Sequence, residues 1–289
     1  MEQALVDAFE AQRPRLTRLA YRMLGSVADA QDAVQDAWLR WARGGGEAAD
    51  PAAWLVRTVT RLCIDRLRAA KAQRDAYRGP WLPEPLVEPL SVDPVERAED
   101  VSVAFLLALE RLSPLERAVF VLHDVFDEDY GAVAATLGRS EAAVRQLASR
   151  ARDHVREARP RFAVAEDQLT RLAAAFTQAT ATADFGALAE LLAEDAVMVT
   201  DGGGVRKAAL RVLVGRDDIL DLLRRLTWRG VAPIEAIWPA RINGFPGFVV
   251  QAQDGLQTIA LEPDVDGRIA HIYQVRNPQK LTHLPAVAA

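Results

Sequence analysis

The stretch GPWLPEPLVEPL, residues 79–90, most constrains how this chain can fold, because four of its twelve residues are proline. Proline lacks a backbone N–H and clashes with the preceding turn, which excludes a helix interior or a central strand here. The 289 residues therefore divide into separate folded parts. A plain connector is polar, whereas this one is rich in apolar side chains. They are Trp81, Leu82, Leu86, Val87 and Leu90.

Both flanks of this stretch have helical periodicity. Residues 1–78 predict helices with short breaks, and Asp50-Pro51 predicts an N-cap followed by the first position of a helix. Residues 98–159 again have a helical pattern. Ser113-Pro114 predicts the start of one helix, and Gly138 predicts the end of another. Beyond residue 165 the pattern predicts an α+β domain. Its predicted helices are 166–180, 184–193 and 216–226, and its β-rich runs are AVMVT, ALRVLV, FVVQA, QTIAL and RIAHIYQV.

Composition excludes several classes of site. Cys63 is the only cysteine, which rules out an intrachain disulfide and a multi-cysteine zinc site, and the four histidines are scattered. We therefore expect no metal and no cofactor. No apolar run approaches the roughly 20 residues of a membrane span, and the N-terminus lacks a signal-peptide pattern. We expect a cytoplasmic protein with no membrane partner.

The placement of charge is more informative than its sum of −5. Residues 52–80 hold seven Lys/Arg against two acids, and residues 139–161 hold seven Arg against three acids. Residues 81–100 hold six acids against Arg97 alone. Two basic blocks flank an acidic spacer, which is typical of two nucleic-acid modules on one chain.

Three helical faces carry this charge. On the predicted helix 27–42, an acidic face opposes an apolar side, and it is either a solvated surface or a dock for a basic helix. On the helix from Ala52, Trp54 heads an arginine stripe that suits single-stranded nucleic acid, unless Trp54 folds back into a neighbouring core. The stretch 127–158 predicts helix, turn and helix, with Ser140 as the N-cap of the second helix. The alternative is a plain helical hairpin.

The order of these elements resembles a bacterial sigma factor of the extracytoplasmic-function type. YRMLGSVADAQDAVQDAWLRW resembles sigma regions 2.1–2.2, AAWLVRTVTRLCIDRLR resembles regions 2.3–2.4, and residues 112–152 resemble region 4. The WLPEP segment, the DGGG turn and the terminal NPxKL resemble the subgroup fused to a SnoaL-like domain. The resemblance implies region 2 at 1–78, a linker at 79–100, region 4 at 101–162 and a SnoaL-like α+β cone at 165–285.

The resemblance also implies roles for individual residues. The polymerase clamp helices would be contacted by Asp29, Asp32, Gln35, Asp36 and Leu39. The minus-ten element would be bound by Trp54, Arg57, Arg61, Arg66 and Arg68. The minus-thirty-five element would be bound by Ser140, Arg145, Gln146, Ser149, Arg150 and Arg152. Many relatives carry Asn where this chain has Thr60-Arg61-Leu62, so the minus-ten preference is not predicted.

The apolar linker leads to a hypothesis about regulation. Its prolines reduce the entropy lost on docking, and the expected partner is the C-terminal domain through the DGGG turn and the NPQKL tail. The docked extension would then modulate the sigma factor in cis. The alternative is a linker that packs only on polymerase. The residues assigned to this contact are Trp81, Leu82, Pro83, Glu84, Pro85, Asp201, Gly202, Gly203, Gly204, Asn277, Pro278, Lys280 and Leu281.

Two classes of function remain. The first is an alternative sigma factor, monomeric when free, which binds the clamp helices and flap of core RNA polymerase and promoter DNA and has no enzymatic activity. The second is a one-component DNA-binding regulator whose cone senses or turns over a small molecule. Candidate bases for such chemistry are Asp184, Asp201 and His271, and none has a convincing partner in sequence. The acidic face of helix 27–42 favours the first class, because a simple repressor needs no polymerase dock.

Overall fold

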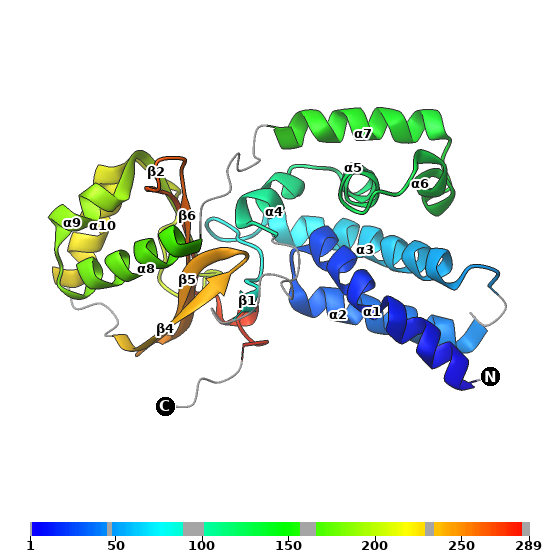
Figure 1. Cartoon of the computed structure of the whole chain (residues 1–289), viewed down its shortest axis with the longest axis horizontal. Coiled ribbons are helices and arrows are strands. Elements are labelled where there is room, and N and C mark those ends of the chain that lie inside the picture. The colour runs from blue at the N-terminus through cyan, green and yellow to red at the C-terminus, as the bar shows by residue number, and fades with distance from the viewer. Residues whose placement is uncertain (1, 45–47, 89–100, 157–165, 229–233, 285–289) are drawn as a thin grey trace. The chain divides into compact units, whose positions relative to one another are not determined.

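The computed structural model describes residues 2–44, 48–88, 101–156, 166–228 and 234–284 (Figure 1). The chain divides into two compact units. The first holds residues 1–75 and 104–159, and the second holds residues 76–103 and 160–289. The linker that begins at residue 79 therefore packs with the C-terminal part of the chain.

The first unit is helical. Its elements are α1 (Glu2–Leu24), α2 (Val27–Gly44), α3 (Pro51–Asp75), α4 (Val103–Glu110), α5 (Pro114–Phe120), the π-helix η2 (Val121–Val125), α6 (Tyr130–Leu137) and α7 (Glu141–Arg156). The boundary signals in the sequence are confirmed. Asp50 accepts a hydrogen bond from the backbone N–H of Ala53 at 3.0 Å. Ser113 and Glu116 form a capping box, and Gly138 ends α6 in the left-handed conformation.

The second unit is α+β, as predicted. Its helices are α8 (Glu166–Ala181), α9 (Phe185–Leu191), α10 (Arg216–Trp228) and the 3-10 helix η3 (Pro278–Lys280). Its strands are β1 (Val87–Glu88), β2 (Leu192–Asp201), β3 (Leu213–Val214), β4 (Ile234–Ile242), β5 (Phe245–Ala252), β6 (Gly255–Pro263) and β7 (Ile269–Val275). They form one sheet in the order β1-β4-β5-β6-β7-β2-β3, and only β2 and β7 pair in parallel among the described strands.

One expected strand is shorter than predicted, and one further strand was not named from the sequence. The run ALRVLV forms a strand only at Leu213–Val214, because Ala209 is held instead by the hydroxyl of Thr200. Strand β4 was not predicted, and it carries Pro239 within the ladder to β5. Proline removes one donor from a strand, so the sequence pattern argued against a strand here.

The sheet has two faces with different coverings. Helices α8, α9 and α10 cover one face, where Phe176, Leu188 and Ile219 share a core with Leu261 and Ile272. Side chains alternate along a strand, so the neighbours of these core residues point to the opposite face. That opposite face receives the linker and the C-terminal tail, and it carries the polar groups described below.

Candidate functional site

The predicted polymerase-binding residues lie on the outer side of α2. Ala30, Ala33, Val34, Ala37 and Trp41 are buried on its other side. Asp29, Asp32 and Gln35 are exposed, and Leu39 is 43% exposed beside them. Asp36 is half-exposed and pairs with Arg66 of α3 at 2.7 Å. The α2 face thus presents carboxylates and one apolar side chain together.

The predicted minus-ten residues lie on α3, opposite a buried stripe. Leu55, Val59, Leu62, Cys63 and Leu67 are buried, as the periodicity indicated. Arg61 and Arg68 are exposed, whereas Arg57 is half-buried. Arg66 is engaged by Asp36, so this predicted DNA ligand and a predicted polymerase ligand neutralise each other in the structure. Arg61 and Arg68 are the most accessible cations of the set.

The position of Trp54 is closer to the alternative in which its ring folds back into a neighbouring core. Its side chain is half-buried, and its ring lies 5.4 Å from the ring of Trp41, centroid to centroid. Trp41 is itself buried and donates its indole N–H to the carbonyl of Leu5 at 2.9 Å. In this state only part of the Trp54 ring is available to a base.

The predicted minus-thirty-five residues lie on α7, the second helix of the helix-turn-helix. Ser140 accepts from the backbone N–H of Ala143 at 3.3 Å and so caps the helix. The outer face of α7 is exposed along its first turns. The exposed members are Arg145, Gln146, Ser149 and Arg150.

Arg152 differs from the other members of the α7 set. Its guanidinium donates to Asp124 at 2.6 Å and to the Tyr130 hydroxyl at 3.1 Å. These contacts tie α7 to η2 and α6. Arg145 lies over the Tyr130 ring, 4.6 Å from its centroid, but remains exposed. Arg152 thus has a structural role within the first unit. Arg150 also pairs with Glu116 of α5 at 3.2 Å, whereas Arg145 pairs with Glu141 of its own helix, at 2.9 Å.

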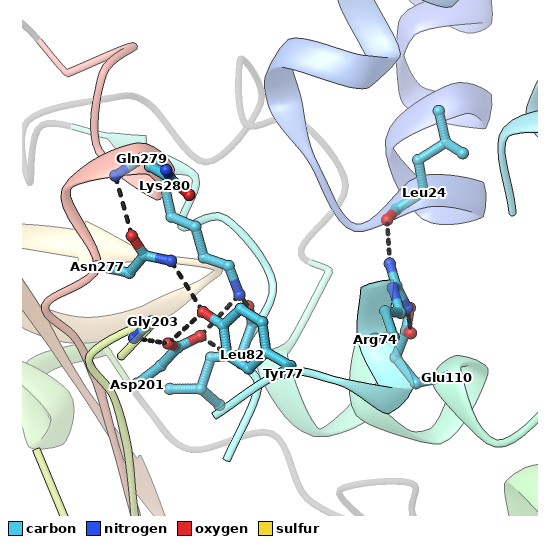
Figure 2. A network of polar contacts seen from close by, with 10 residues as sticks. All are labelled: Leu24, Arg74, Tyr77, Leu82, Glu110, Asp201, Gly203, Asn277, Gln279 and Lys280. Carbon is cyan, nitrogen blue, oxygen red and sulfur yellow. Dashed lines mark hydrogen bonds and ion pairs between the residues drawn. The ribbon is translucent and has the colours of Figure 1, made fainter. Parts of the chain in front are cut away.

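A buried cluster of charges ties α1, α3, α4 and α5 together, and sequence reasoning missed it. Glu110 of α4 pairs with Arg74 of α3 and with Arg117 of α5. Arg117 is 2% exposed and also donates to the carbonyl of Met23 at 2.8 Å. Burial lowers the pKa of Arg117 to about 9, so its ion pair and hydrogen bonds stabilise a charge that is costly to bury. Figure 2 includes the Arg74–Glu110 part of this cluster.

The second unit holds the linker through the Asp201 network (Figure 2), which comprises Asp201, Tyr77, Leu82, Asn277 and Lys280. Asp201 is fully buried and accepts from the Tyr77 hydroxyl at 2.6 Å and from the backbone N–H of Leu82 at 2.8 Å. It also pairs with Lys280 at 2.7 Å. The Lys280 ammonium donates to the Leu82 carbonyl as well. One aspartate therefore binds both the linker and the C-terminal tail.

The DGGG turn and the tail are shaped for this network. The Asp201 carboxylate accepts from the backbone N–H of Gly203 at 2.9 Å. A Cβ at Gly203 would lie 2.3 Å from the side-chain nitrogen of Asn277, and the φ of Gly203 is +61°. Asn277 donates to the Tyr77 hydroxyl at 2.8 Å and caps η3. Glycine at position 203 is thus required by both backbone conformation and space.

The apolar part of the linker is packed into the second unit. Leu82, Pro83, Glu84 and Pro85 are buried, and the Trp81 ring lies 4.2 Å from the Lys280 ammonium. The Tyr77 ring approaches the same ammonium at 4.8 Å. Lys280 therefore lies between two aromatic rings, which stabilises a cation in a water-poor setting.

A second attachment of the linker was missed from sequence. Asn243, in the turn between β4 and β5, accepts from the backbone N–H of Leu86 at 3.1 Å and donates to the carbonyl of Val101 at 3.1 Å. Strand β1 then pairs with the end of β4. The His283 ring bonds the Pro85 carbonyl at 2.8 Å. Asn243 has a φ of +49°, a conformation that asparagine adopts more readily than most residues. An asparagine at this turn was the one sequence signal available.

The three candidate bases are not brought together with a shared partner. Asp184 caps α9 by accepting from the backbone N–H of Ala187 at 3.0 Å, and Asp201 is committed to the linker. His271 lies beside Glu262, which is 4% exposed and accepts from the Tyr273 hydroxyl at 2.9 Å. Burial raises the pKa of Glu262 to about 7 and lowers the pKa of His271. Glu262 was missed, although it is an acid at the end of an apolar strand.

No helix among the described residues is long and apolar enough to cross a membrane. No group of three or more His, Cys, Asp or Glu side chains within that part of the chain could hold a metal ion.

Comparison with known proteins identifies the family. The Sigma-70 region 2 model matches residues 8–73, and the Sigma-70 region 4 model matches residues 102–155. The chain is 39% identical to the ECF RNA polymerase sigma factor SigJ of Mycobacterium tuberculosis, over 97% of this chain and 94% of that protein. It is 33% identical to the probable ECF sigma factor SigI of the same species, over 96% and 95%.

A solved structure agrees with these matches. The crystal structure of the M. tuberculosis extracytoplasmic function sigma factor SigJ superposes with a TM-score of 0.77 at 37% identity, covering 96% of this chain and 98% of that one. The predicted fold, with helical sigma regions 2 and 4 followed by an α+β sheet domain, is confirmed. With α2, α3 and the α6–α7 helix-turn-helix in the expected order, the chain belongs to the extracytoplasmic-function RNA polymerase sigma factors.

Proposed function

We propose that this sigma factor binds the clamp helices and flap of core RNA polymerase and directs promoter-specific initiation, under control of its own C-terminal domain. The polymerase contact uses the α2 face around Asp32 and Leu39. Arg61 and Arg68 of α3 bind the minus-ten region, and Arg145 and Gln146 of α7 read the minus-thirty-five region. The protein acts as a monomer in the cytoplasm, with no enzymatic activity and no cofactor.

The exposure of these residues supports the assignment. Leu39 is a large apolar side chain in water beside carboxylates, which suits a protein partner with a basic rim. The Arg145 and Gln146 side chains are exposed near the N-terminal end of α7, the part of a recognition helix that meets base edges. Arginine and glutamine recognise guanine and adenine edges through paired hydrogen bonds.

Regulation in cis rests on one observation, the burial of the linker by the Asp201 network. A linker segment that binds Asp201 and Lys280 is not available to polymerase at the same time. The free protein thus has a docked and an undocked linker, and polymerase shifts the population toward the state that it binds better. The C-terminal domain replaces a separate regulator because it is covalently attached, at high effective concentration.

Run-off transcription tests the whole proposal. Core polymerase, the full-length chain and the DNA upstream of its own gene are mixed, alongside a chain truncated after residue 164 and a Trp81→Ala variant. Val265→Ala is the matched control, since Val265 is an apolar side chain that is 56% exposed in the second unit. We expect a defined start site that requires the chain, and a change of yield on truncation and in Trp81→Ala but not in Val265→Ala.

Two outcomes would contradict different parts of the proposal. Equal transcription by all four chains would refute control through the linker and leave the sigma function intact. Failure of the full-length and truncated chains to bind core polymerase would refute the sigma function. The one-component regulator, with a cone that senses a small molecule, would then be the better account.

A further inference from the structure

A cavity of about 210 Å³ lies beside the DGGG turn, within the second unit. One wall is the start of the linker, at Arg78, Gly79 and Pro80. The facing wall is the segment after Asp201, from Gly202 to Leu210. The cavity therefore lies where the linker meets the C-terminal domain, and it is separate from the three catalytic candidates considered above.

The lining of this cavity is basic. It includes Arg78, Arg206 and Lys207 and contains no acidic side chain among its described residues. Two acids adjoin residues of this region, next to Gly202 and next to Gly255, and both are already engaged. Asp201 pairs with Lys280, and Asp254 pairs with Arg276 at 2.6 Å. In the part of the chain that the structure describes, none of the three lining cations has an acidic partner, so their mutual repulsion is not compensated.

Glycines make room for the two arginines. A Cβ at Gly204 would lie 3.3 Å from the Cβ of Arg78, and a Cβ at Gly255 would lie 2.4 Å from a guanidinium nitrogen of Arg206. Both glycines also have positive φ. The backbone thus lets Arg78 and Arg206 lie close against it, which restricts two side chains that are otherwise long and flexible. Restricted arginines with unused donors are the usual basis of anion recognition.

We propose that this cavity binds a small phosphate-bearing anion, held between Arg78 of the linker and Arg206 and Lys207 of the C-terminal domain. The planar guanidinium fork matches the oxygens of a phosphate group. The cavity is smaller than the 300–1,000 Å³ or so that drug-sized ligands occupy, which favours a compact ligand with two charged groups. A small polycarboxylate has related chemistry and is the competing class.

The position of the site predicts that a bound ligand would affect the docking of the linker. Because it would bridge the linker and the domain, a bound anion would stabilise the docked linker by a free energy that grows with the logarithm of one plus the ratio of its concentration to its Kd. This consequence rests on the proposed control in cis, whereas anion binding itself does not. Binding and transcription therefore need separate measurements.

Isothermal titration of inorganic pyrophosphate into the full-length protein tests the site, with ionic strength held constant by sodium chloride. We expect saturable binding with one site per chain. Arg206→Ala and Arg78→Ala should each weaken binding at least tenfold, and Arg206→Lys should recover only part of it because the fork is lost. Arg211→Ala is the matched control, since Arg211 is exposed, pairs with Asp218 and lies outside the cavity lining.

Citrate, titrated in parallel, distinguishes the two ligand classes. Tighter binding of pyrophosphate than of citrate supports a phosphate site, and the reverse overturns that assignment. Absence of saturable pyrophosphate binding, or undiminished binding by both alanine variants with native circular dichroism, overturns the site. If pyrophosphate binds but leaves run-off transcription unchanged, the anion site stands and only its link to the linker fails.

Discussion

Two regions of this sigma factor, the outer faces of α2 and α7 and the Asp201 network, use charge in opposite ways. On α2 and α7 of the first unit, charged side chains lie on the surface, and the Asp36–Arg66 pair is 47% and 27% exposed. In the second unit, the Asp201–Lys280 pair is 0% and 10% exposed. Exposed pairs contribute little to stability, whereas breaking a buried pair leaves a charge without solvent or partner. Charge on these surfaces thus stays accessible to solvent and partners, whereas the buried charge of the Asp201 network holds the linker.

The largest expected effect comes from breaking the buried pair. Asp201→Ala leaves the Lys280 ammonium buried and unpaired and removes acceptors from Tyr77 and Leu82, at a cost of about 3–5 kcal/mol. Hydrogen exchange of peptides covering residues 77–86 measures it, and we expect protection of the Leu82 amide to fall by about a hundredfold or more.

Asp221→Ala is the control for that change, because Asp221 pairs with Arg224 on the surface of α10, where both side chains are about half-exposed. It should cost less than about 1 kcal/mol. Equal protection in the two variants would mean that burial does not distinguish the two kinds of pair, and the comparison would fail.

The next effect depends on pH and concerns Glu262. Its pKa is raised from 4.5 to about 7 by burial, so between these values the folded protein keeps a proton that the unfolded chain has released. Stability from this group is present below pH 4.5 and is lost as the pH rises through 7. Glu262→Gln is neutral at all pH values, so it should match the wild type near pH 4 and exceed it by about 3 kcal/mol near pH 8.

Urea unfolding of the second unit at several pH values measures this difference. The control is Glu194→Gln, an exposed glutamate on β2 of the same sheet, for which we expect a difference near zero throughout. Taking the difference from wild type also removes the opposite contribution of His271, whose lowered pKa disfavours the folded state in acid. A flat profile for Glu262→Gln would show that Glu262 is ionised in the fold.

A smaller effect tests the surface of α7. Arg145→Ala should weaken binding to the minus-thirty-five element by about 1–3 kcal/mol without changing protein stability by more than about 0.5 kcal/mol. Fluorescence anisotropy with holoenzyme and promoter DNA measures the binding. The control is Arg225→Ala on α10, whose side chain is 69% exposed. It should change neither promoter affinity nor protein stability. If Arg145→Ala loses equal affinity for a cognate and a scrambled element, Arg145 contacts phosphate and does not read bases.

The smallest expected change in binding is at Asp36. Asp36→Ala breaks a partly exposed pair and should cost less than about 1 kcal/mol. It should nevertheless reduce affinity for core polymerase by about fivefold, roughly 1 kcal/mol. Asp65→Ala, a 73%-exposed aspartate on α3, is the control. If the two variants bind core polymerase equally well, the acidic face of α2 is only a solvated surface.

The sequence predicted most of the first unit because its signals are local. Asp50-Pro51, Ser113-Pro114 and Gly138 each mark a helix end through chemistry within four residues. The exposed and buried faces of α2, α3 and α7 follow from the helical period alone. The Arg74–Glu110–Arg117 cluster could not be predicted, because it joins residues on three helices and depends on tertiary packing.

The second unit was predicted less completely for the same reason. The WLPEP, DGGG and NPQKL segments were expected to meet, and the structure brings them together at Asp201. The partners Tyr77 and Asn243 carry no pattern that marks them, since each acts through two long-range hydrogen bonds. Strand β4 was hidden by Pro239, and β1 by the surrounding prolines of the linker.

The two hydrogen bonds at Leu82 predict which sequences the linker can tolerate. Asp201 accepts from the Leu82 N–H and Lys280 donates to the Leu82 carbonyl, so the domain reads backbone at this position. Proline lacks that N–H. Related chains that keep the aspartate and the lysine can therefore vary the side chain here within the apolar class. Proline is excluded at this position, although prolines stand close by at 80, 83 and 85.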